Sequence, residues 1–198
     1  LATREVFISV DEYLAIDERS KYRNEYFNGE VFQMAGSKFN HNLISSNILF
    51  NLRVKLENKD CDVLSSDLRV KADEFHYFYP DIVVACQPKL TPDIFDTLEN
   101  PTVIVEITSK STASRDKNEK RLAFLQMDSL NDYLIVSQKE MLIEHYSRIS
   151  AEEWSYKIYE SPKQQILLKS LDVGVTLEQI YRKIEFPPKK LRLVNSKK

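Results

Sequence analysis

Two short apolar runs each carry one carboxylate, and together they form the strongest chemical signal in the chain. Asp81 lies near the start of Tyr79–Ala85, and Glu106 lies inside Thr102–Thr108. Both runs have the length and the β-branched content of buried strands. A lone acid in such a run is costly to desolvate unless something pairs with it. Two such acids on neighbouring strands would suit Mg²⁺ or Mn²⁺, with the backbone carbonyl of Ile107 as a third oxygen ligand. The alternative is two structural acids at strand ends.

Lys120 is the first candidate for a positive charge beside these acids. Helical spacing places it on one face with Asp116, Ala123, Phe124 and Met127. An ammonium in such an apolar arc needs a partner, and it could stabilise negative charge on a phosphoryl oxygen. The alternative is a surface ion pair with Asp116. Lys110 and Lys117 compete for the same role.

Glu25 and His41 are further candidates for contact with a metal-bound water. Glu25 precedes an Asn-Gly turn, and His41 shares a helical face with Ile44 and Ile48. The structural alternatives are an acid at a hairpin edge and a core histidine that is already hydrogen-bonded. The other two histidines, His76 and His145, are expected at the surface.

The predicted elements alternate between helices and strands. Helices are expected over 9–16, over 41–56, from about 113 to 127, and in a short segment opening at Thr176, with Ser9 and Thr176 starting capping boxes. A hairpin is expected over 24–34, and strands over 61–64, 68–71, 77–85, 103–108, 132–137, 141–146, 154–159 and 166–168. Pro88–Asp93 is expected to be a loop. The order helix, three strands, helix, strand predicts an α/β core with a mixed sheet and helices on its faces.

Composition limits the possible functions. The chain has 198 residues and a formal net charge of −2, and without the five positive charges in Pro187–Lys198 that charge would be −7. The body is therefore no general polyanion binder. Glycine is too scarce for a phosphate-binding loop, so no nucleotide cofactor is expected, and no apolar run could span a membrane.

Cys61 and Cys86 are expected to be reduced and buried, which favours a cytoplasmic location.

A wider set of residues resembles one nuclease family. The segments that carry the resemblance are Tyr79–Val84, Val105–Thr112 with Asp116 and Lys120, Ser66–Val70 and Asp132–Val136, together with Glu25 and His41. They resemble the Uma-type restriction endonuclease family of the PD-(D/E)XK nuclease superfamily. The resemblance implies a restriction-endonuclease-like αβββαβ core in which Asp81 and Glu106 hold the metal. The superfamily has a lysine where this chain has Thr108, and Lys120 matches the lysine that the family carries on the following helix.

The expected organisation is one nuclease-like domain over 1–186 and a basic tail over 187–198. The core spans about 37–148, with an N-terminal helix and hairpin over 9–36 and a C-terminal extension over 149–186. The expected function is Mg²⁺-dependent hydrolysis of DNA phosphodiester bonds by a homodimer. The alternatives are a non-catalytic module that binds nucleic acid or a protein partner, and a small-molecule hydrolase that uses the same carboxylates.

Overall fold

The fold is built on a mixed central sheet of six strands. The computed structural model describes residues 7–92, 95–108 and 116–186. The strand order is β12-β11-β10-β9-β6-β3, formed by β3 (Cys61–Ser65), β6 (Ile82–Cys86), β9 (Val103–Thr108), β10 (Asp132–Ser137), β11 (Ile143–Arg148) and β12 (Trp154–Tyr159). Only β9 and β10 pair in parallel within this sheet. The α/β class with a mixed sheet and the order of the core elements, both predicted from the sequence, are confirmed.

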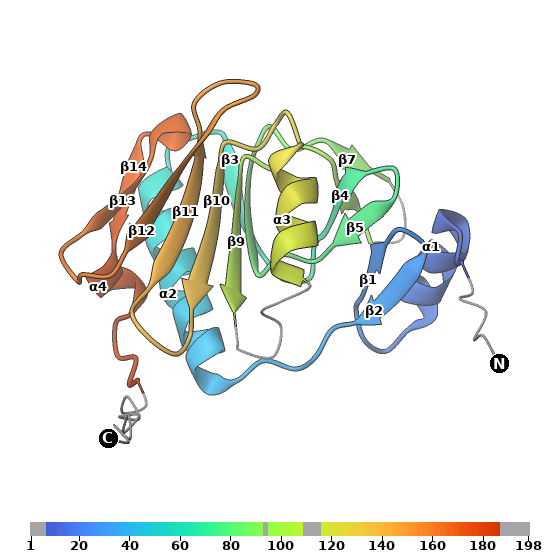
Figure 1. Cartoon of the computed structure of the whole chain (residues 1–198), viewed down its shortest axis with the longest axis horizontal. Coiled ribbons are helices and arrows are strands. Elements are labelled where there is room, and N and C mark those ends of the chain that lie inside the picture. The colour runs from blue at the N-terminus through green and yellow to red at the C-terminus, as the bar shows by residue number, and fades with distance from the viewer. Residues whose placement is uncertain (1–6, 93–94, 109–115, 187–198) are drawn as a thin grey trace, which may run out of the picture.

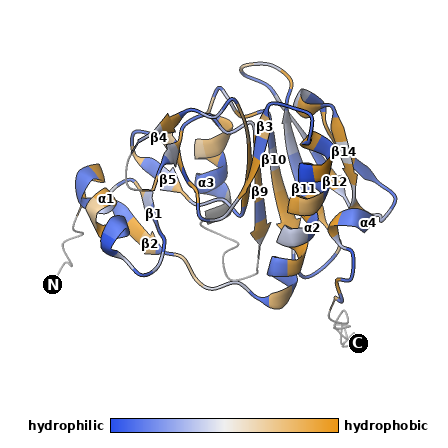
Figure 2. Ribbon diagram, turned by 180° about the vertical axis from the view of Figure 1, so that it is seen from behind, coloured by the Kyte–Doolittle hydropathy of each residue, from blue (hydrophilic) through white to orange (hydrophobic). Residues whose placement is uncertain are grey.

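Helices cover both faces of the central sheet (Figure 1). The long helix α2 (Phe39–Leu56) packs on one face together with α4 (Leu177–Ile180), the strands β13 (Gln165–Leu168) and β14 (Val173–Thr176), and the 3₁₀ turn Lys169–Leu171. On the other face lies α3 (Asp116–Leu125). Side chains alternate between the two faces along β9. Those of Val105 and Ile107 pack in the core on the α2 side, and that of Ile104 packs in the core on the α3 side. Glu106 therefore belongs to the α3 face. Figure 2 shows β9 and β10 as mostly hydrophobic strands, as burial on both faces requires.

A second sheet of six short strands packs beside α3. Its order is β2-β1-β5-β4-β8-β7, formed by β1 (Asn24–Phe27), β2 (Glu30–Gln33), β4 (Arg69–Asp73), β5 (His76–Phe78), β7 (Leu90–Thr91) and β8 (Thr97–Leu98). The N-terminal helix α1 (Val10–Arg19) lies against β1 at the far end of the molecule from α4 (Figure 1). Through β1, this outer sheet brings N-terminal residues toward the central sheet.

Local sequence signals confirm several of the expected elements. The capping boxes of α1 and α4 are both present, at Ser9–Glu12 and at Thr176–Gln179. The β1–β2 hairpin turns at Asn28 and Gly29, which both have positive φ, of 47° and 90°. Two successive residues with positive φ are what an Asn-Gly hairpin turn requires.

The single strand expected over 77–85 is wrong. The chain forms β5 in the outer sheet, breaks at Tyr79–Asp81, and enters the central sheet as β6. Pro80 explains the break, because it has no N–H for a ladder hydrogen bond and restricts its own φ. Because of this break, Asp81 lies just before the first residue of β6 and takes no part in the strand pairing.

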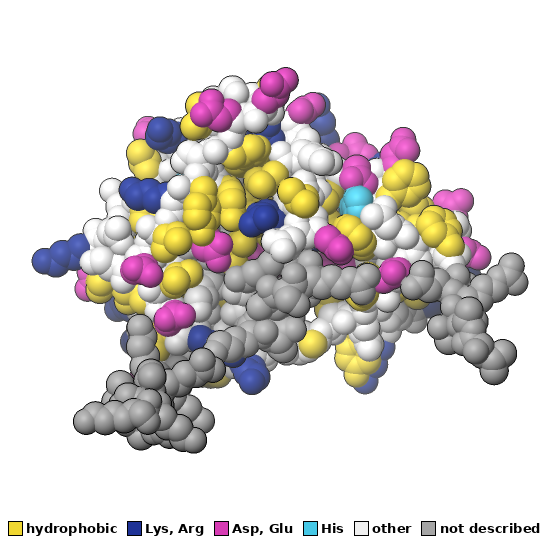
Figure 3. Space-filling view, in the orientation of Figure 1, with side chains coloured by type: hydrophobic (Ala, Val, Ile, Leu, Met, Phe, Trp, Pro, Cys, Tyr) yellow, Lys and Arg dark blue, Asp and Glu magenta, His cyan; other side chains and the backbone are white. Residues whose placement is uncertain are grey.

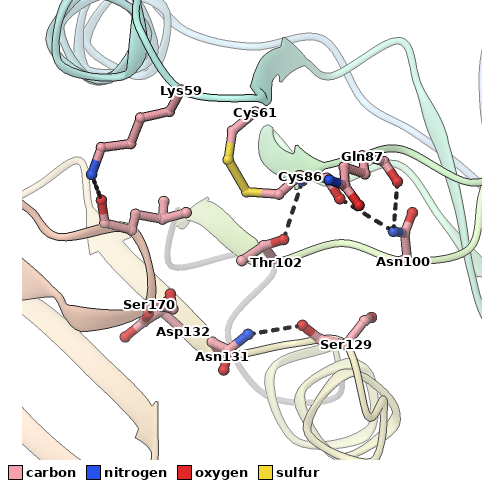
Figure 4. The surroundings of a disulfide bond; sticks show 11 residues. Lys59, Cys61, Cys86, Gln87, Asn100, Thr102, Ser129, Asn131, Asp132 and Ser170 are labelled. Atoms are coloured by element: carbon pink, nitrogen blue, oxygen red, sulfur yellow. Dashed lines mark hydrogen bonds between the residues drawn. A yellow bond between two sulfur atoms is a disulfide. The ribbon is translucent and has the colours of Figure 1, made fainter.

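The prediction of two reduced cysteines is also wrong. Cys61 and Cys86 form a disulfide, and they are directly opposite each other where β3 pairs with β6. Figure 4 shows the bond at the end of these strands, where the Cys86 amide also donates to Thr102 Oγ1 at 3.3 Å. The expected cytoplasmic location depended on unpaired thiols, so it loses that support.

The remaining differences are small. The helix expected to reach residue 127 ends at Leu125, and residues 113–115 at its expected start lie outside the described part of the chain. The loop expected over 88–93 contains the short strand β7, and residue 93 is not described. Strands β8 and β14 were not expected. Within the described residues, no helix has the length and apolar character to cross a bilayer.

Candidate active site

Asp81 and Glu106 meet where β6 begins beside β9. The last ladder pair at this end joins Ile82 to Val105, so the next residue on each strand is Asp81 and Glu106 respectively. The Ile107 amide donates a hydrogen bond to Asp81 Oδ2 at 2.6 Å, which fixes the Asp81 carboxylate against β9. The strand break at Pro80 and the register of β6 with β9 thus bring together two acids that are distant in the sequence.

Lys120 extends from α3 to Glu106 and to a third acid, Glu25. Its ammonium nitrogen lies 2.8 Å from Glu106 Oε1 and 2.6 Å from Glu25 Oε1. The same nitrogen lies 5.3 Å from the centre of the Phe78 ring. One positive charge is therefore held between two carboxylates in a site that is largely shielded from solvent.

Glu25 reaches the site from the outer sheet. It lies on β1, which pairs with β5 through Tyr26 and Tyr77. The Tyr79 amide donates to Glu25 Oε1 at 3.1 Å, just before the break at Pro80. Glu25 is therefore joined both to Lys120 and to the segment that carries Asp81.

His41 approaches Asp81 from the opposite side of the central sheet. It lies in the first turn of α2, and its Nε2 is 3.0 Å from Asp81 Oδ1. The other ring nitrogen, Nδ1, is buried and has no hydrogen-bond partner among the described residues. The Asp81 carboxylate is thus held by His41 on one oxygen and by the Ile107 amide on the other.

These side chains line one cavity of about 560 Å³. The structure brings all of the predicted site residues to it: Glu25, His41, Asp81, Glu106, Ile107 and Lys120. The five ionisable side chains are each only 11–17% exposed. Sequence reasoning missed Phe78, Tyr133 and Gln138, which also line the cavity. Gln138 had a detectable signal, because it directly follows β10, whose end lies beside Thr108 of β9.

Burial is the largest single influence on the pKa values of Glu106, Lys120 and Tyr133. Burial, with the nearby charges of Asp81 and Glu25, raises the pKa of Glu106 to about 8 despite the opposing effect of Lys120. Burial alone would lower the pKa of Lys120, but the charges of Glu106 and Glu25 outweigh burial and raise this pKa above its usual value. Burial, reinforced by Glu106, also raises the pKa of Tyr133. Lys120 therefore stays charged, and the acids around it outnumber it.

A second buried network, on the outer-sheet side, supports the segment that leads to Asp81. Arg69 Nη1 lies 3.0 Å from Asp17 Oδ2, and both side chains are almost completely buried. The Tyr79 hydroxyl donates to the same Asp17 oxygen, and Arg69 Nε donates to Thr97 Oγ1 at 2.9 Å. Helix α1, β4 and Tyr79 are thereby joined two residues before Asp81.

The structure also bears on the expectations for the remaining lysine candidates and for the other two histidines. Lys110 and the side chains of Asp116 and Lys117 lie outside the described residues. The expectation that His145 is exposed is wrong, since its ring is 4% exposed and its Nε2 lies 2.7 Å from Asp132 Oδ1. His76 is also largely covered, because it pairs with Asp73 at 2.6 Å and packs on Phe27. Both histidines pair with an acid on the neighbouring strand; Asp73 is three residues from His76, whereas Asp132 is brought to His145 by the pairing of β10 with β11.

The donor set is compatible with a hard divalent cation. In the described ranges, no group of three or more His, Cys, Asp or Glu side chains is arranged around a common point. Mg²⁺ does not require such a cage, because it commonly binds one or two carboxylates and keeps several waters. Burial, with the nearby charges of Asp81 and Glu25, disfavours the ionised form of Glu106. A cation beside Asp81 and Glu106 would favour that form.

Together, this αβββαβ core and its buried acid–lysine site define a nuclease-like fold. The chain belongs to the Uma2 family, described as "Putative restriction endonuclease", and the match covers residues 10–179. It is 32% identical to the uncharacterized Synechocystis protein sll1609 over 149 residues, which are 74% of this chain and 84% of the relative. It is 29% identical to the uncharacterized slr1290 of the same organism over 180 residues, 90% of this chain and 94% of the relative.

A solved structure has the same fold. It is the crystal structure from Anabaena variabilis titled "a putative nuclease belonging to DUF820". The two structures superpose with a TM-score of 0.70 at 16% identity, over 88% of this chain and 97% of the other. At this level of identity the likeness concerns the fold alone.

Proposed function

We propose that the protein is a Mg²⁺- or Mn²⁺-dependent endonuclease that hydrolyses DNA phosphodiester bonds. The observation that carries the proposal is the convergence of Asp81, Glu106 and Lys120 on one cavity, with more acid than base. Family membership and a nuclease-like fold support the same reaction class.

In this proposal, Asp81 and Glu106 hold the cation, with the carbonyl of Ile107 as a further oxygen ligand. A bound Mg²⁺ or Mn²⁺ would lower the pKa of a water and polarise the phosphoryl oxygen. The contacts of Asp81 with His41 and with the Ile107 amide keep its carboxylate oriented before any ligand arrives. Such preorganisation reduces the cost of assembling the site.

Lys120 has the charge-stabilising role. When water attacks phosphorus in line, the new P–O bond forms as the bond to the leaving oxygen breaks. Negative charge then develops on the phosphoryl oxygens, and a fixed ammonium in a poorly solvated cavity stabilises it strongly. Glu25 positions Lys120 through the 2.6 Å contact. Lys120 thereby replaces the lysine that the superfamily carries at the position of Thr108.

His41 contacts both Asp81 and the cavity, so it is placed to exchange a proton with the water or the leaving group. A homodimer, in which two such sites act on two strands, is part of the same proposal.

The proposal is tested by cleavage of supercoiled plasmid and of circular single-stranded DNA in Mg²⁺, Mn²⁺ or EDTA. We expect metal-dependent cleavage that is abolished by Asp81→Asn and by Glu106→Gln. Asp62→Asn on β3 removes the same charge from an exposed position and serves as the matched control. Cleavage that survives both site substitutions in the folded protein would refute the assignment.

The alternative is a non-catalytic module that binds nucleic acid or a protein partner. The ion pairs of Lys120 with Glu25 and Glu106 favour it, because they occupy the ammonium in the absence of substrate. Titration calorimetry separates the two functions. Absence of heat at millimolar Mg²⁺ and Mn²⁺, together with an inactive wild-type protein, would select the module.

A further inference from the structure

A second cavity adjoins the site cavity and shares Asp81 with it. This Tyr22 cavity, of about 430 Å³, is lined by Tyr22, Arg23, Ser66 and Asp67. The two cavities also share the segment Gln33–Ser37, which lines both. Asp81 can therefore be reached from either side of this segment.

The shared segment is a connection without regular structure. It starts at the last residue of β2 and leads to α2, which begins at Phe39, and Figure 1 shows it running between the outer sheet and the foot of α2. Its residues are exposed except for the half-buried Met34. Each cavity has roughly the volume of a small-ligand pocket, which suits about one nucleotide.

The outer end of the Tyr22 cavity carries an aromatic ring and a cation. Tyr22 is 53% exposed. Arg23 is 30% exposed and rests on the Phe95 ring at 4.4 Å, which holds the guanidinium in place. Its ion pair with Asp67 is long, at 3.8 Å, and Asp67 is 84% exposed, so solvent screens that pair. A nucleobase could stack on Tyr22 while a phosphate meets Arg23.

Lys38 provides a cation at the edge of the site cavity. A path from Tyr22 past Asp81 to Lys38 therefore has positive charge at both ends and acids in the middle. Elsewhere on the surface, Figure 3 shows Lys and Arg side chains scattered singly among acidic ones on the face in view. The described residues of this face therefore form no continuous basic stripe of the kind that follows the phosphates of a long duplex.

We propose that the substrate is a single-stranded DNA segment that occupies both cavities, with the scissile phosphate at Asp81. This inference rests on the proposed function for the place of cleavage. A duplex keeps its bases stacked and paired, so no base could reach the Tyr22 ring without being unstacked first. A single strand offers unstacked bases and a flexible backbone that can bend around the Gln33–Ser37 segment.

The test measures binding separately from cleavage. The full-length Asp81→Asn protein in EDTA is titrated into a fluorescently labelled 12-nucleotide single strand and into the same sequence as a blunt duplex. We expect the single strand to bind at least tenfold more tightly. Adding Tyr22→Ala should weaken that binding by about tenfold, the usual loss for one stacked base. Tyr156→Ala is the matched control, because Tyr156 is similarly exposed, at 50%, but lies on β12.

Equal affinity for single strand and duplex would overturn the inference, as would equal effects of the Tyr22 and Tyr156 substitutions. Because binding and cleavage are measured separately, failure of the inference can be told apart from failure of the proposed function. If the wild-type protein cleaves DNA but shows no such preference, the inference fails and the nuclease assignment stands. If Tyr22-dependent binding is found without any cleavage, the nuclease assignment fails and a single-strand binding site stands.

Discussion

The ammonium nitrogen of Lys120 lies 2.6 Å from Oε1 of Glu25, although 95 residues separate the two in the sequence. Glu25 belongs to the outer sheet, and Lys120 belongs to the helix that packs on the central sheet. Their contact therefore joins two layers of the fold at the cavity itself. The proposed activity and the stability of the fold should both depend on this contact, and several measurements can separate the two.

Replacement of Lys120 by Met should impair both properties. Cleavage should fall by at least 100-fold, the size of effect seen when one charge-stabilising group is removed. Unfolding free energy should fall by about 3–5 kcal/mol, because Glu25 and Glu106 lose their buried partner. Denaturant unfolding measures the loss, which should be larger at pH 8 than at pH 5. The double variant Lys120→Met/Glu106→Gln should recover part of the stability; if it is less stable than the single variant, the two acids are not the source of the cost.

Stability of the metal-free protein should decrease as pH rises from about 5 to 8. Glu106 has a pKa of about 8 in the folded protein, against 4.5 as its ordinary value. Between these values the folded state holds a proton that the unfolded state has released, so raising the pH favours unfolding. Thermal melts in EDTA across this window measure the decrease.

Glu106→Gln should flatten that pH dependence, and Asp62→Asn should leave it unchanged. If Asp81 and Glu106 hold a cation, millimolar Mg²⁺ should raise the melting temperature more at pH 8 than at pH 5, because binding requires the ionised acid. A decrease that persists unchanged in Glu106→Gln would assign the titration to another group.

The network of Asp17, Arg69 and Tyr79 should affect the site through position alone. Arg69→Met leaves the Asp17 carboxylate buried without its charged partner and should cost about 3–5 kcal/mol of unfolding free energy. Tyr79→Phe removes one hydrogen bond to that carboxylate and should cost about 1.5–3 kcal/mol. In folded Tyr79→Phe, DNA cleavage should slow while its pH profile keeps the wild-type shape. A shifted profile would instead make Tyr79 a participant in proton transfer.

The disulfide should contribute stability without contributing to catalysis. It closes a loop between residues 25 positions apart, for which chain entropy gives roughly 3–4 kcal/mol. The Cys61→Ser/Cys86→Ser variant should therefore melt at a lower temperature, and the wild-type protein should do so after reduction. Cleavage well below the melting temperature should be equal in the oxidised and reduced proteins. Loss of activity on reduction of the folded protein would contradict this prediction.

The sequence predicted the central elements and the acids because those signals are local. Apolar runs, capping boxes and the Asn-Gly turn depend on neighbouring residues, and Asp81 and Glu106 were conspicuous as charges inside apolar runs. Pro80 was a visible signal for the break between β5 and β6, but the surrounding aliphatic residues outweighed it. The disulfide depends on the β3–β6 register, which the sequence alone does not supply. The pairing of Glu25 with Lys120, the burial of His145 and the Tyr22 cavity likewise come from tertiary packing.

The placement of Glu25 on β1 has a practical consequence for dividing this protein into fragments. A truncation starting at α2 would retain Asp81, Glu106 and the whole central sheet, and so would resemble a complete version of the proposed nuclease core. It would lose the Glu25 carboxylate that contacts Lys120, and it would expose Tyr77 of β5, which now packs against Tyr13 and Tyr26. Helix α1 and the β1–β2 hairpin therefore need to be kept in any fragment used to test the proposed function.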